Sequence, residues 1–506
     1  MYPLASKIIP RFLHPHLRRI ENSALGSRLA KGAFWSLFGS LISRGLGLLS
    51  AILVGRMLGK NDYGALGIIQ NTIGMFGTLA GLGMGLTANK HIAEFKRTNP
   101  ERAGRILGVS STIAWITSSV LAAIMIAGAP WLATCMLNAP QLGEVLRVGA
   151  LLLLLGGVNG AQIGTLSGFE AFKSIAHINL VSGVLTFPLM IGGVWLWGIT
   201  GAVWSLVGSQ AVNCLLCHIA VRKESNRFGI HSSLVGWRSE WSLVCAFSVP
   251  AVITGLINSL VSWGASVSVV KQVSGYGDMG VYNAVMRVKL LPEAFLGMLI
   301  APVLPVLSEA FGKGDRQGME RTLRFNFLLA FLLLIPVSLL QTAFPLLTVL
   351  PFGNDYQNRP EIVQWLMLHS VVYALLFPMG GILISMGKMW FSCIVNVCYA
   401  VMLFVLSCLL IPRYGAAGYA ASTAISFALG NVPCVIFLYR SMPIIMREIQ
   451  WCNQAFISII AFVLVAIAGT CFPDWWALAV GFVISIAFVI FLLTSLRGKW
   501  SRLRVL

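Results

Sequence analysis

Apolar runs of roughly 18 or more residues, each long enough to cross about 30 Å of hydrocarbon as a helix, recur from one end of this chain to the other. Because hydrocarbon cannot satisfy backbone N–H and C=O groups, such runs are expected to be α-helices, which satisfy these groups internally. The composition agrees, since 57% of the 506 residues are hydrophobic and only 10% are charged. The sequence therefore predicts an all-α polytopic membrane protein with about 14 transmembrane helices.

The positive charges are distributed unequally between the two sides of the predicted bundle. With the N-terminus inside, 27 of the 36 Lys and Arg residues fall in cytoplasmic loops and tails, and six fall on the opposite side. Cytoplasmic loops of membrane proteins carry such an excess, so we expect both termini in the cytoplasm. The same distribution accounts for the formal net charge of +19. The basic residues therefore do not indicate a nucleic-acid partner.

Several short patterns recur at a nearly constant offset along the chain: Tyr63-Gly64 with Met279-Gly280, Gly198-x-x-Gly201 with Gly415-x-x-Gly418, and Gly168 and Phe172 with Gly387 and Phe391. Six predicted spans separate the two copies, so both copies should have the same orientation in the membrane. Parallel repeats of this kind occur in carriers that bind substrate between two helical bundles. The sequence thus predicts two six-helix lobes followed by two further helices.

These observations divide the chain into six predicted segments. They are a basic cytoplasmic N-terminal extension (1–31), an N-lobe of spans 1–6 (32–221), a cytoplasmic linker (222–240), a C-lobe of spans 7–12 (241–440), spans 13–14 (454–496) and a basic cytoplasmic tail (497–506). The N-terminal extension has a second interpretation, because its apolar and basic residues could form a helix that lies in the membrane interface.

Arg44 and Arg287 are charges inside predicted spans, and neither has an acidic residue at a partnering position on its own helix. An ionisable group in hydrocarbon is costly and commonly marks a substrate pathway. Arg44 shares a helix face with small and polar residues, namely Ser40, Gly47 and Ala51. We expect both arginines to face an anionic substrate, although Arg44 could instead bond to backbone carbonyls.

Lys289 and Glu293 complete the set of charges inside the predicted spans. They are four residues apart, so they could simply form an ion pair on one helix face. Alternatively, both belong to the substrate site and Lys289 assists the two arginines in neutralising the anionic substrate. Polar side chains also line one face of neighbouring spans, among them Gln70, Asn71 and Asn258. Such faces either pack closely or line a cavity. Because the spans concerned are related by the repeat, we favour one cavity between the lobes.

No enzymatic or cofactor-binding motif accompanies these features. The sequence contains no HExxH, no P-loop and no Gly-x-Ser-x-Gly, and the ten cysteines show no metal-ligand spacing. We therefore expect neither catalytic residues, nor a metal, nor a cofactor. His369 and His218 are expected to be packed or interfacial rather than to act as proton relays.

Residues in five places resemble Wzx-type oligosaccharide flippases of the multidrug/oligosaccharidyl-lipid/polysaccharide exporter superfamily: Ser43-Arg44-x-x-Gly47, Gly55-Arg56-x-Leu58-Gly59, Tyr63-Gly64, Gly168-Phe-Glu-Ala-Phe172 and Pro305-x-Leu-Ser308-Glu309. The resemblance implies a two-lobed bundle in the bacterial inner membrane that moves an undecaprenyl-diphosphate-linked oligosaccharide between leaflets. It implies no cofactor. The implied partners are membrane lipids and, beyond the substrate, a polysaccharide polymerase with its chain-length machinery.

The related lipid II flippase carries functional arginines that map onto Arg44 and approximately onto Arg287. Its other basic positions fall on Ser50 and within 74–79, where this chain has no basic residue. That difference favours another lipid-linked glycan over the peptidoglycan precursor. A multidrug or cation antiporter of the same superfamily is the main alternative. A membrane glycosyltransferase or polymerase would require a large loop that the chain lacks.

Overall fold

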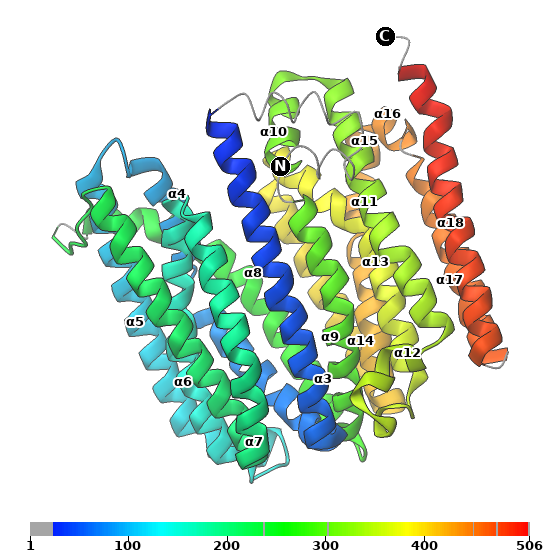
Figure 1. The fold of residues 1–506 in the computed structure, drawn as a ribbon, viewed down its shortest axis with the longest axis horizontal. Coiled ribbons are helices and arrows are strands. Elements are labelled where there is room, and N and C mark those ends of the chain that lie inside the picture. The colour runs from blue at the N-terminus through cyan, green and yellow to red at the C-terminus, as the bar shows by residue number, and fades with distance from the viewer. Residues whose placement is uncertain (1–23, 236–237, 301–302, 449, 472–473, 504–506) are drawn as a thin grey trace.

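The computed structural model describes residues 24–235, 238–300, 303–448, 450–471 and 474–503. Within these ranges the chain forms helices joined by short turns and contains no strand, which confirms the all-α prediction (Figure 1). Most of the predicted N-terminal extension lies outside the described residues. The two interpretations of that extension therefore stay predictions.

The helices follow one another with few intervening residues. The first half comprises α3 (Ala24–Ala80), α4 (Met84–Phe95), α5 (Pro100–Trp131), α6 (Leu142–Gly168) and α7 (Phe172–Arg227). The second half comprises α8 (Arg238–Val270), α9 (Gly275–Ile300), α10 (Val303–Lys313), α11 (Arg316–Ala343), α12 (Leu346–Val349), α13 (Pro360–Ser385), α14 (Met389–Gly430), α15 (Val432–Ser441), α16 (Pro443–Glu448), α17 (Trp451–Cys471) and α18 (Asp474–Leu503).

Nine helices in the described ranges are long and apolar enough to cross a membrane. Three helices, α3, α7 and α14, are interrupted by non-helical residues at Gly59, at Trp197 and Gly198, and at Gly415 respectively. The apolar stretches that contain α7 and α14 run for 56 and 52 residues. These lengths are more than twice the roughly 20 residues that one crossing needs. The exact count of 14 spans stays a prediction.

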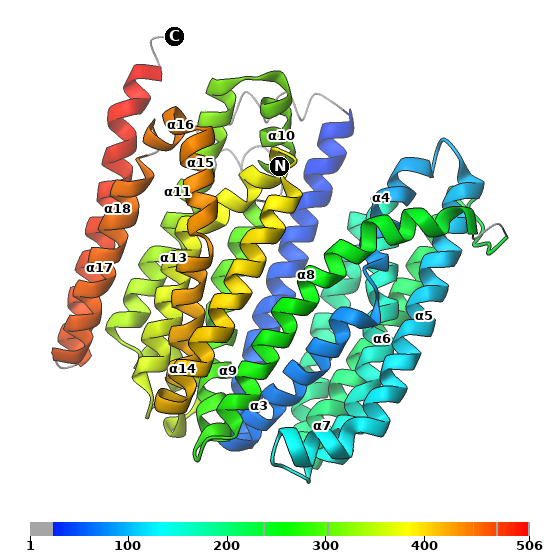
Figure 2. The same cartoon turned by 180° about the vertical axis from the view of Figure 1, so that it is seen from behind.

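The helices form two groups that diverge toward the upper end of Figure 1, where α3 begins and α18 ends. In the first group α3 packs against α6 and α7, and α5 and α4 pack against α6. In the second group α13 packs against α11 and α14, and α14 packs against α8 and α9. Helix α8 crosses obliquely from the first group to the second (Figure 2). Helices α17 and α18 pack against α11 at the outer edge.

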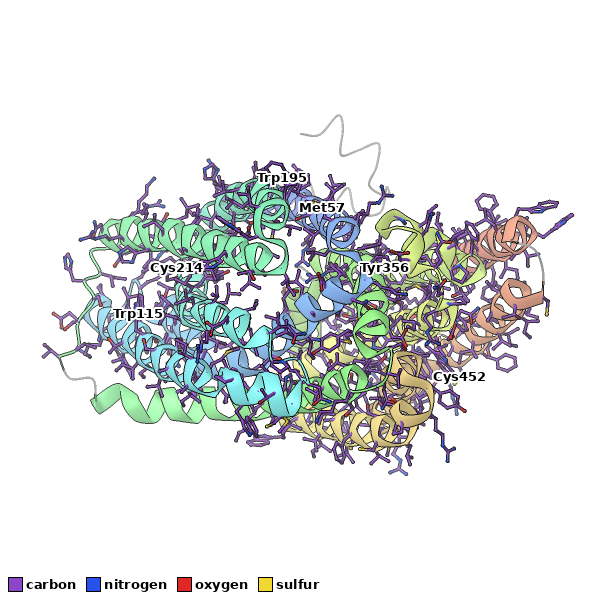
Figure 3. The ribbon with its side chains drawn as sticks, turned by 90° about the horizontal axis from the view of Figure 1, so that it is seen from below. Met57, Trp115, Trp195, Cys214, Tyr356 and Cys452 are labelled. Atoms are coloured by element: carbon purple, nitrogen blue, oxygen red, sulfur yellow. The ribbon has the colours of Figure 1, made fainter. Side chains whose placement is uncertain are left out.

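Large apolar side chains cover the outside of the bundle. Trp115 and Trp195 lie at its periphery and are 48% and 77% exposed (Figure 3). In water such a surface would aggregate, whereas in a bilayer lipid chains contact it at little cost. The exposed surface of the described chain is thus suited to a lipid solvent.

Matching backbone conformations in the two halves support the predicted repeat. Gly198 in α7 has φ 55° and ψ −132°, and Gly415 in α14 has φ 56° and ψ −132°. Both glycines lie in the left-handed range of φ, which residues with a β-carbon rarely adopt. Side-chain caps match as well, because Asn99 accepts from the Arg102 amide and Asp315 accepts from the Gly318 amide. Both features recur at the offset of the predicted repeat, to within a single position.

One predicted pairing within the repeat is wrong. The sequence paired Gly168 with Gly387, but Glu170, with φ 60°, occupies the left-handed position that Gly387, with φ 69°, takes in the other half. The turns after α6 and α13 otherwise share the same hydrogen bonds, including Ala171 N to Leu166 O and Lys388 N to Leu383 O. Because Glu170 is not a glycine, pairing glycines with glycines could not identify it as the equivalent of Gly387.

The two lobes touch where the repeated glycines meet. A β-carbon at Gly64 would collide with the carbonyl oxygen of Tyr276, and one at Gly280 would collide with the carbonyl oxygen of Lys60. Tyr276 follows Lys60 by the same number of positions that separates Gly280 from Gly64. The contact is therefore the same patch used twice around a pseudo-two-fold axis, as in a symmetric dimer interface.

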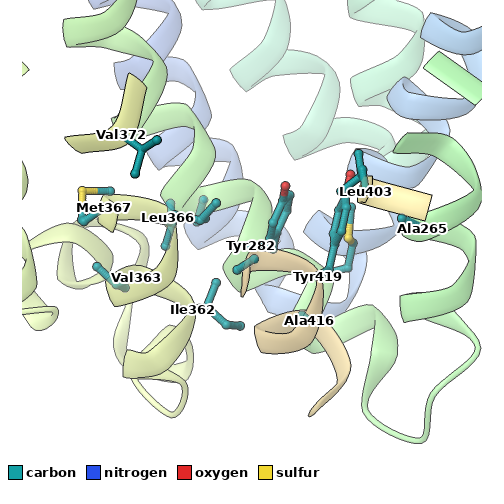
Figure 4. Close-up of a cluster of buried hydrophobic side chains, with 14 of the residues drawn as sticks. Ala265, Tyr282, Ile362, Val363, Leu366, Met367, Val372, Leu403, Ala416 and Tyr419 are labelled. Atoms are coloured by element: carbon teal, nitrogen blue, oxygen red, sulfur yellow. The ribbon is translucent and has the colours of Figure 1, made fainter. Parts of the chain in front are cut away.

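Buried apolar side chains continue from this contact into both lobes. Tyr282 of α9 and Tyr419 of α14 stack with ring centroids 4.7 Å apart, beside Leu366 of α13 and Ala265 of α8 (Figure 4). Aromatic pairs of this kind contribute about 0.5–1.5 kcal/mol beyond the area that they bury. The packing fixes α9 against three neighbours and so fixes the side chains that α9 carries.

Replacing Gly64 by Ala should destabilise the protein, although Ala normally stabilises a helix interior by about 0.5–1 kcal/mol relative to Gly. The added methyl group forces α3 and α9 apart at their closest approach. Gly74→Ala is the matched control, because nothing lies within 4 Å of a β-carbon at Gly74 on the same helix. Thermal unfolding in detergent should show a lower Tm for Gly64→Ala and an equal or higher Tm for Gly74→Ala. Equal midpoints in the two variants would contradict the close contact.

Candidate functional site

A cavity of about 820 Å³ lies between the two lobes. Both parts of α3 line it on either side of Gly59, together with α7, α8, α9, α13 and α14. The sequence predicted the contributions of α3, α8 and α9, but not those of α7, α13 and α14. The cavity brings together six of the seven predicted site residues: Gln70, Asn71, Asn258, Arg287, Lys289 and Glu293.

Arg287 is the exposed cation of this cavity. Its Nη2 atom donates a hydrogen bond to Oε1 of Gln70, 2.5 Å away on α3. This bond crosses from one lobe to the other, and it leaves the guanidinium without a carboxylate among its hydrogen-bond partners in the described ranges. An arginine held by a neutral amide keeps its full charge for an anionic ligand.

Lys289 and Glu293 form the ion pair that their spacing allows. Nζ of Lys289 lies 2.8 Å from Oε1 of Glu293, and the two side chains are only 3% and 8% exposed. The hydroxyl of Ser370 on α13 donates a second hydrogen bond, of 2.9 Å, to the same oxygen. The pair is thus buried and engaged, unlike Arg287.

His369 is packed between helices and also lines the cavity. Its ring stacks near Tyr373 and Phe427, and its Nδ1 atom lies 4.0 Å from Oε1 of Glu293. Within the described residues this buried nitrogen has no hydrogen-bond partner. The adjacent polar residues His369 and Ser370 in an otherwise apolar span were the signal that sequence reasoning missed.

Neutral polar groups occupy the part of the cavity next to α8. Nδ2 of Asn71 donates to Oγ of Ser266, 3.3 Å away, and the indole N–H of Trp263 donates to Oγ1 of Thr72 at 3.0 Å. Asn258 lies on the same side of the cavity lining. Amide, hydroxyl and aromatic groups together can bind an uncharged polar ligand such as a sugar.

Arg44 is the one predicted site residue that the structure leaves outside the cavity lining. It lies on α3 one turn before Gly47, which does line the cavity, and its side chain is exposed. The predicted face is therefore continuous with the cavity, but Arg44 lies beyond its edge. A direct substrate role for Arg44 stays a prediction.

Hydrogen bonds also join the two lobes at the lower end of the bundle in Figure 1, where α8 ends and α9 begins. The hydroxyl of Tyr356 donates to the carbonyl of Gly55 at 2.9 Å, and Tyr276 reaches across to the carbonyl of Leu137 at 2.7 Å. Nε of Arg56 also donates to the carbonyl of Pro351. Two of these bonds join α3 to the second group, and the bond to Leu137 joins the turn between α5 and α6 to the second group. All three lie beside the contact at Gly64.

The site contains nothing typical of a metal centre in the described ranges, where no group of three His, Cys, Asp or Glu residues has the necessary proximity. What it offers is one available cation, one engaged ion pair and a polar, partly aromatic wall. The fold and this site define a polytopic membrane protein with a partly polar cavity between two repeat-related lobes.

The family model described as polysaccharide biosynthesis protein matches residues 29–311, more than half of the chain, and the chain belongs to that family. A second family model, MatE, matches residues 250–409. The chain is 22% identical to the lipid III flippase of Escherichia coli over 81% of its own length and 98% of the relative. It is 20% identical to the probable low-salt glycan biosynthesis flippase Agl15 of Haloferax volcanii, over 84% and 87%.

Solved structures share the fold. An inward-facing multidrug resistance MATE family transporter of the MOP superfamily aligns with a TM-score of 0.67 and 15% identity, covering 82% of this chain and 99% of that one. The lipid II flippase MurJ in an inward closed conformation aligns with a TM-score of 0.67 and 14% identity, covering 92% and 98%. These similarities confirm a polytopic, all-helical membrane fold.

Replacing Lys289 by Met should destabilise the protein by about 3–5 kcal/mol, because it leaves the buried Glu293 carboxylate without its counter-ion. The double variant Lys289→Met/Glu293→Leu should recover most of that loss, since an apolar pair avoids the desolvation cost of both charges. Thermal unfolding of the single and double variants, compared as a double-mutant cycle, tests this. Purely additive effects would show that the two side chains do not interact in the folded protein.

Proposed function

We propose that this protein is a flippase that moves an undecaprenyl-diphosphate-linked oligosaccharide across the bacterial inner membrane. The observation that carries the proposal is Arg287, a cation held by neutral Gln70 and exposed in a cavity between the lobes. A guanidinium binds phosphate oxygens in pairs through its planar fork. The polar and aromatic wall beside α8 then contacts the sugars.

The mechanism we propose is alternating access of the two lobes. The lobes are the N-lobe (32–221) and the C-lobe (241–440) that the sequence predicts. In this mechanism the contacts around Gly64, Gly280 and Tyr356 close the lower end of the cavity. We place the opposite end, where α3 begins, in the cytoplasm, since the sequence assigns 27 of the 36 Lys and Arg residues to cytoplasmic loops and tails. The substrate would enter from there and leave after the lower contacts separate. The names of the lipid III and glycan flippases to which the chain is similar support transport of a lipid-linked glycan.

Cation antiport is the second candidate, and the match of residues 250–409 to the MatE model favours it. A site for a cationic drug needs an available carboxylate. Glu293 is the single carboxylate among the described lining residues, and Lys289 and Ser370 already engage it. The charge of the cavity therefore suits an anionic ligand better than a cationic one.

Arg287→Gln should slow flipping by roughly tenfold or more, because a hydrogen bond to a charged group contributes about 1.5–3 kcal/mol. Arg287→Lys should retain part of the rate, since it keeps the charge and loses the fork. The measurement uses the full chain in proteoliposomes with a fluorescent undecaprenyl-diphosphate-linked disaccharide, and follows the label that a membrane-impermeant quencher cannot reach.

Arg413→Gln is the control for this experiment, because it removes an exposed arginine that does not line the cavity. It should flip at the wild-type rate. An Arg287→Gln variant that inserts normally and flips as fast as the control would overturn the proposed role of Arg287. If the vesicles instead move a cationic dye against a proton gradient and do not flip the lipid, antiport replaces flipping as the function.

A further inference from the structure

We propose that Lys289 is a second phosphate ligand of the cavity, kept out of use by Glu293 and released when Glu293 takes up a proton. This inference rests on the proposed function and adds the step by which the site changes its charge. It identifies the ion pair as part of substrate binding rather than as a purely structural contact.

The charges that line the cavity do not balance those of a diphosphate while Glu293 is ionised. Among the described lining residues, Arg287 contributes one positive charge, and Lys289 and Glu293 cancel each other. A diphosphate diester carries two negative charges at neutral pH. The cavity therefore has one cation too few while Glu293 is ionised. One added proton on Glu293 gives the lining two net positive charges, which match the diphosphate.

Burial makes an unpaired charge on Lys289 or Glu293 costly. Both side chains of the pair are more than nine-tenths buried, so neither ion is stabilised by much water. A buried ammonium whose carboxylate becomes neutral must find another anion or reach water. The four-carbon stem of Lys289 is flexible, and the side chain already lines the cavity that holds Arg287. A bound diphosphate is the anion in reach.

Ser370 and His369 lie where they can form hydrogen bonds with the neutral carboxylic acid of Glu293. Ser370 already donates to Oε1 of Glu293 at 2.9 Å. Nδ1 of His369 lies 4.0 Å from the same oxygen and has no hydrogen-bond partner within the described residues. A shift of about 1 Å would bring this nitrogen to hydrogen-bond distance, where it can accept the new O–H. His369 is thus a positioning residue for the proton.

Most other titratable groups in the cavity lining are tyrosines, among them Tyr63 on α3 and Tyr282 on α9. On α13 Tyr373 interacts electrostatically with Glu293, and on α14 Tyr399 and Tyr419 line the same cavity. The neighbouring helices α10 and α11 carry charges in ion pairs of their own, Lys313 with Glu309 and Arg324 with Glu320. Glu293 is therefore the carboxylate in the described cavity lining that can change its charge.

The proton step is balanced as follows. A proton from cavity water binds the Glu293 carboxylate, the ion pair with Lys289 separates, and the ammonium then bonds to a phosphate oxygen. Loss of the proton re-forms the ion pair, and the diphosphate loses one of its two cations. Uptake of a proton thus favours binding, and its loss favours release. One proton accompanies each binding event.

The test measures binding of farnesyl-diphosphate-linked N-acetylglucosamine to the purified full chain at pH values from 5.5 to 8.5. This probe is a diphosphate diester, so its own charge stays constant over the range. We expect wild-type protein to bind it at least roughly tenfold more tightly at the acidic end, which corresponds to about 1.4 kcal/mol. Glu293→Gln should bind tightly at every pH, because its side chain is permanently neutral.

Three further variants separate the possible outcomes. Lys289→Gln/Glu293→Gln should bind weakly at every pH, since it lacks the second cation, and its neutral pair guards against misfolding. His369→Leu should move the midpoint of the pH dependence to a lower pH, because the neutral acid loses its acceptor. Glu309→Gln is the matched control, since it removes the carboxylate of an exposed i,i+4 Lys–Glu pair, and it should behave as wild type.

The results distinguish this inference from the proposed function. Wild-type binding that is lost in Arg287→Gln but does not change with pH would overturn the role of Lys289 and leave the flippase proposal intact. The same holds if Glu293→Gln keeps the wild-type pH dependence. A wild-type protein that does not bind the probe at any pH would overturn both proposals.

Discussion

The close approach of α3 and α9 at Gly64 and Gly280 is the contact on which the central cavity depends. Neither helix tolerates a β-carbon there, so the backbones of the two lobes meet directly. One to two turns further along, the same pair of helices carries Gln70 and Arg287, and their hydrogen bond spans the lobes. A looser contact would separate the amide from the guanidinium. The position of the Arg287 guanidinium is thus set by the absence of two side chains.

The fold was largely predictable because its causes are local in the sequence. Apolar length predicts spanning helices, and recurring glycines predict repeated breaks such as those at Gly198 and Gly415. Pairing by residue type failed where conformation and identity differ, as at Glu170 and Gly387. Helix lengths do not give the number of spans, because α3, α7 and α14 each continue through a break of only one or two non-helical residues.

The candidate site was predictable in part. Unpaired charge within apolar runs selected Arg287, which the structure places in the cavity lining, because the cost of burying charge is visible in sequence spacing alone. The i,i+4 spacing likewise gave the Lys289–Glu293 pair. The approach of His369 and Ser370 to Glu293 is a contact between separate helices, far apart in the sequence, which no local pattern encodes. Arg44 lies outside the lining for the same reason, since spacing fixes a face but not the edge of a cavity.

The departures from the repeat locate the chemistry. At the offset that relates Gly280 to Gly64, Arg287, Lys289 and Glu293 correspond to Asn71, Ile73 and Gly77, so the N-lobe contributes none of the charged groups in the described cavity lining. Symmetry itself forces some of this difference. Gly67 and Asn283 are equivalent positions that face each other near the axis, and a β-carbon at Gly67 would collide with the Asn283 amide. Only one of two such positions can hold a side chain. A duplicated scaffold therefore provides two lobes of similar fold, while close contact at the axis leaves room for only one of two equivalent side chains.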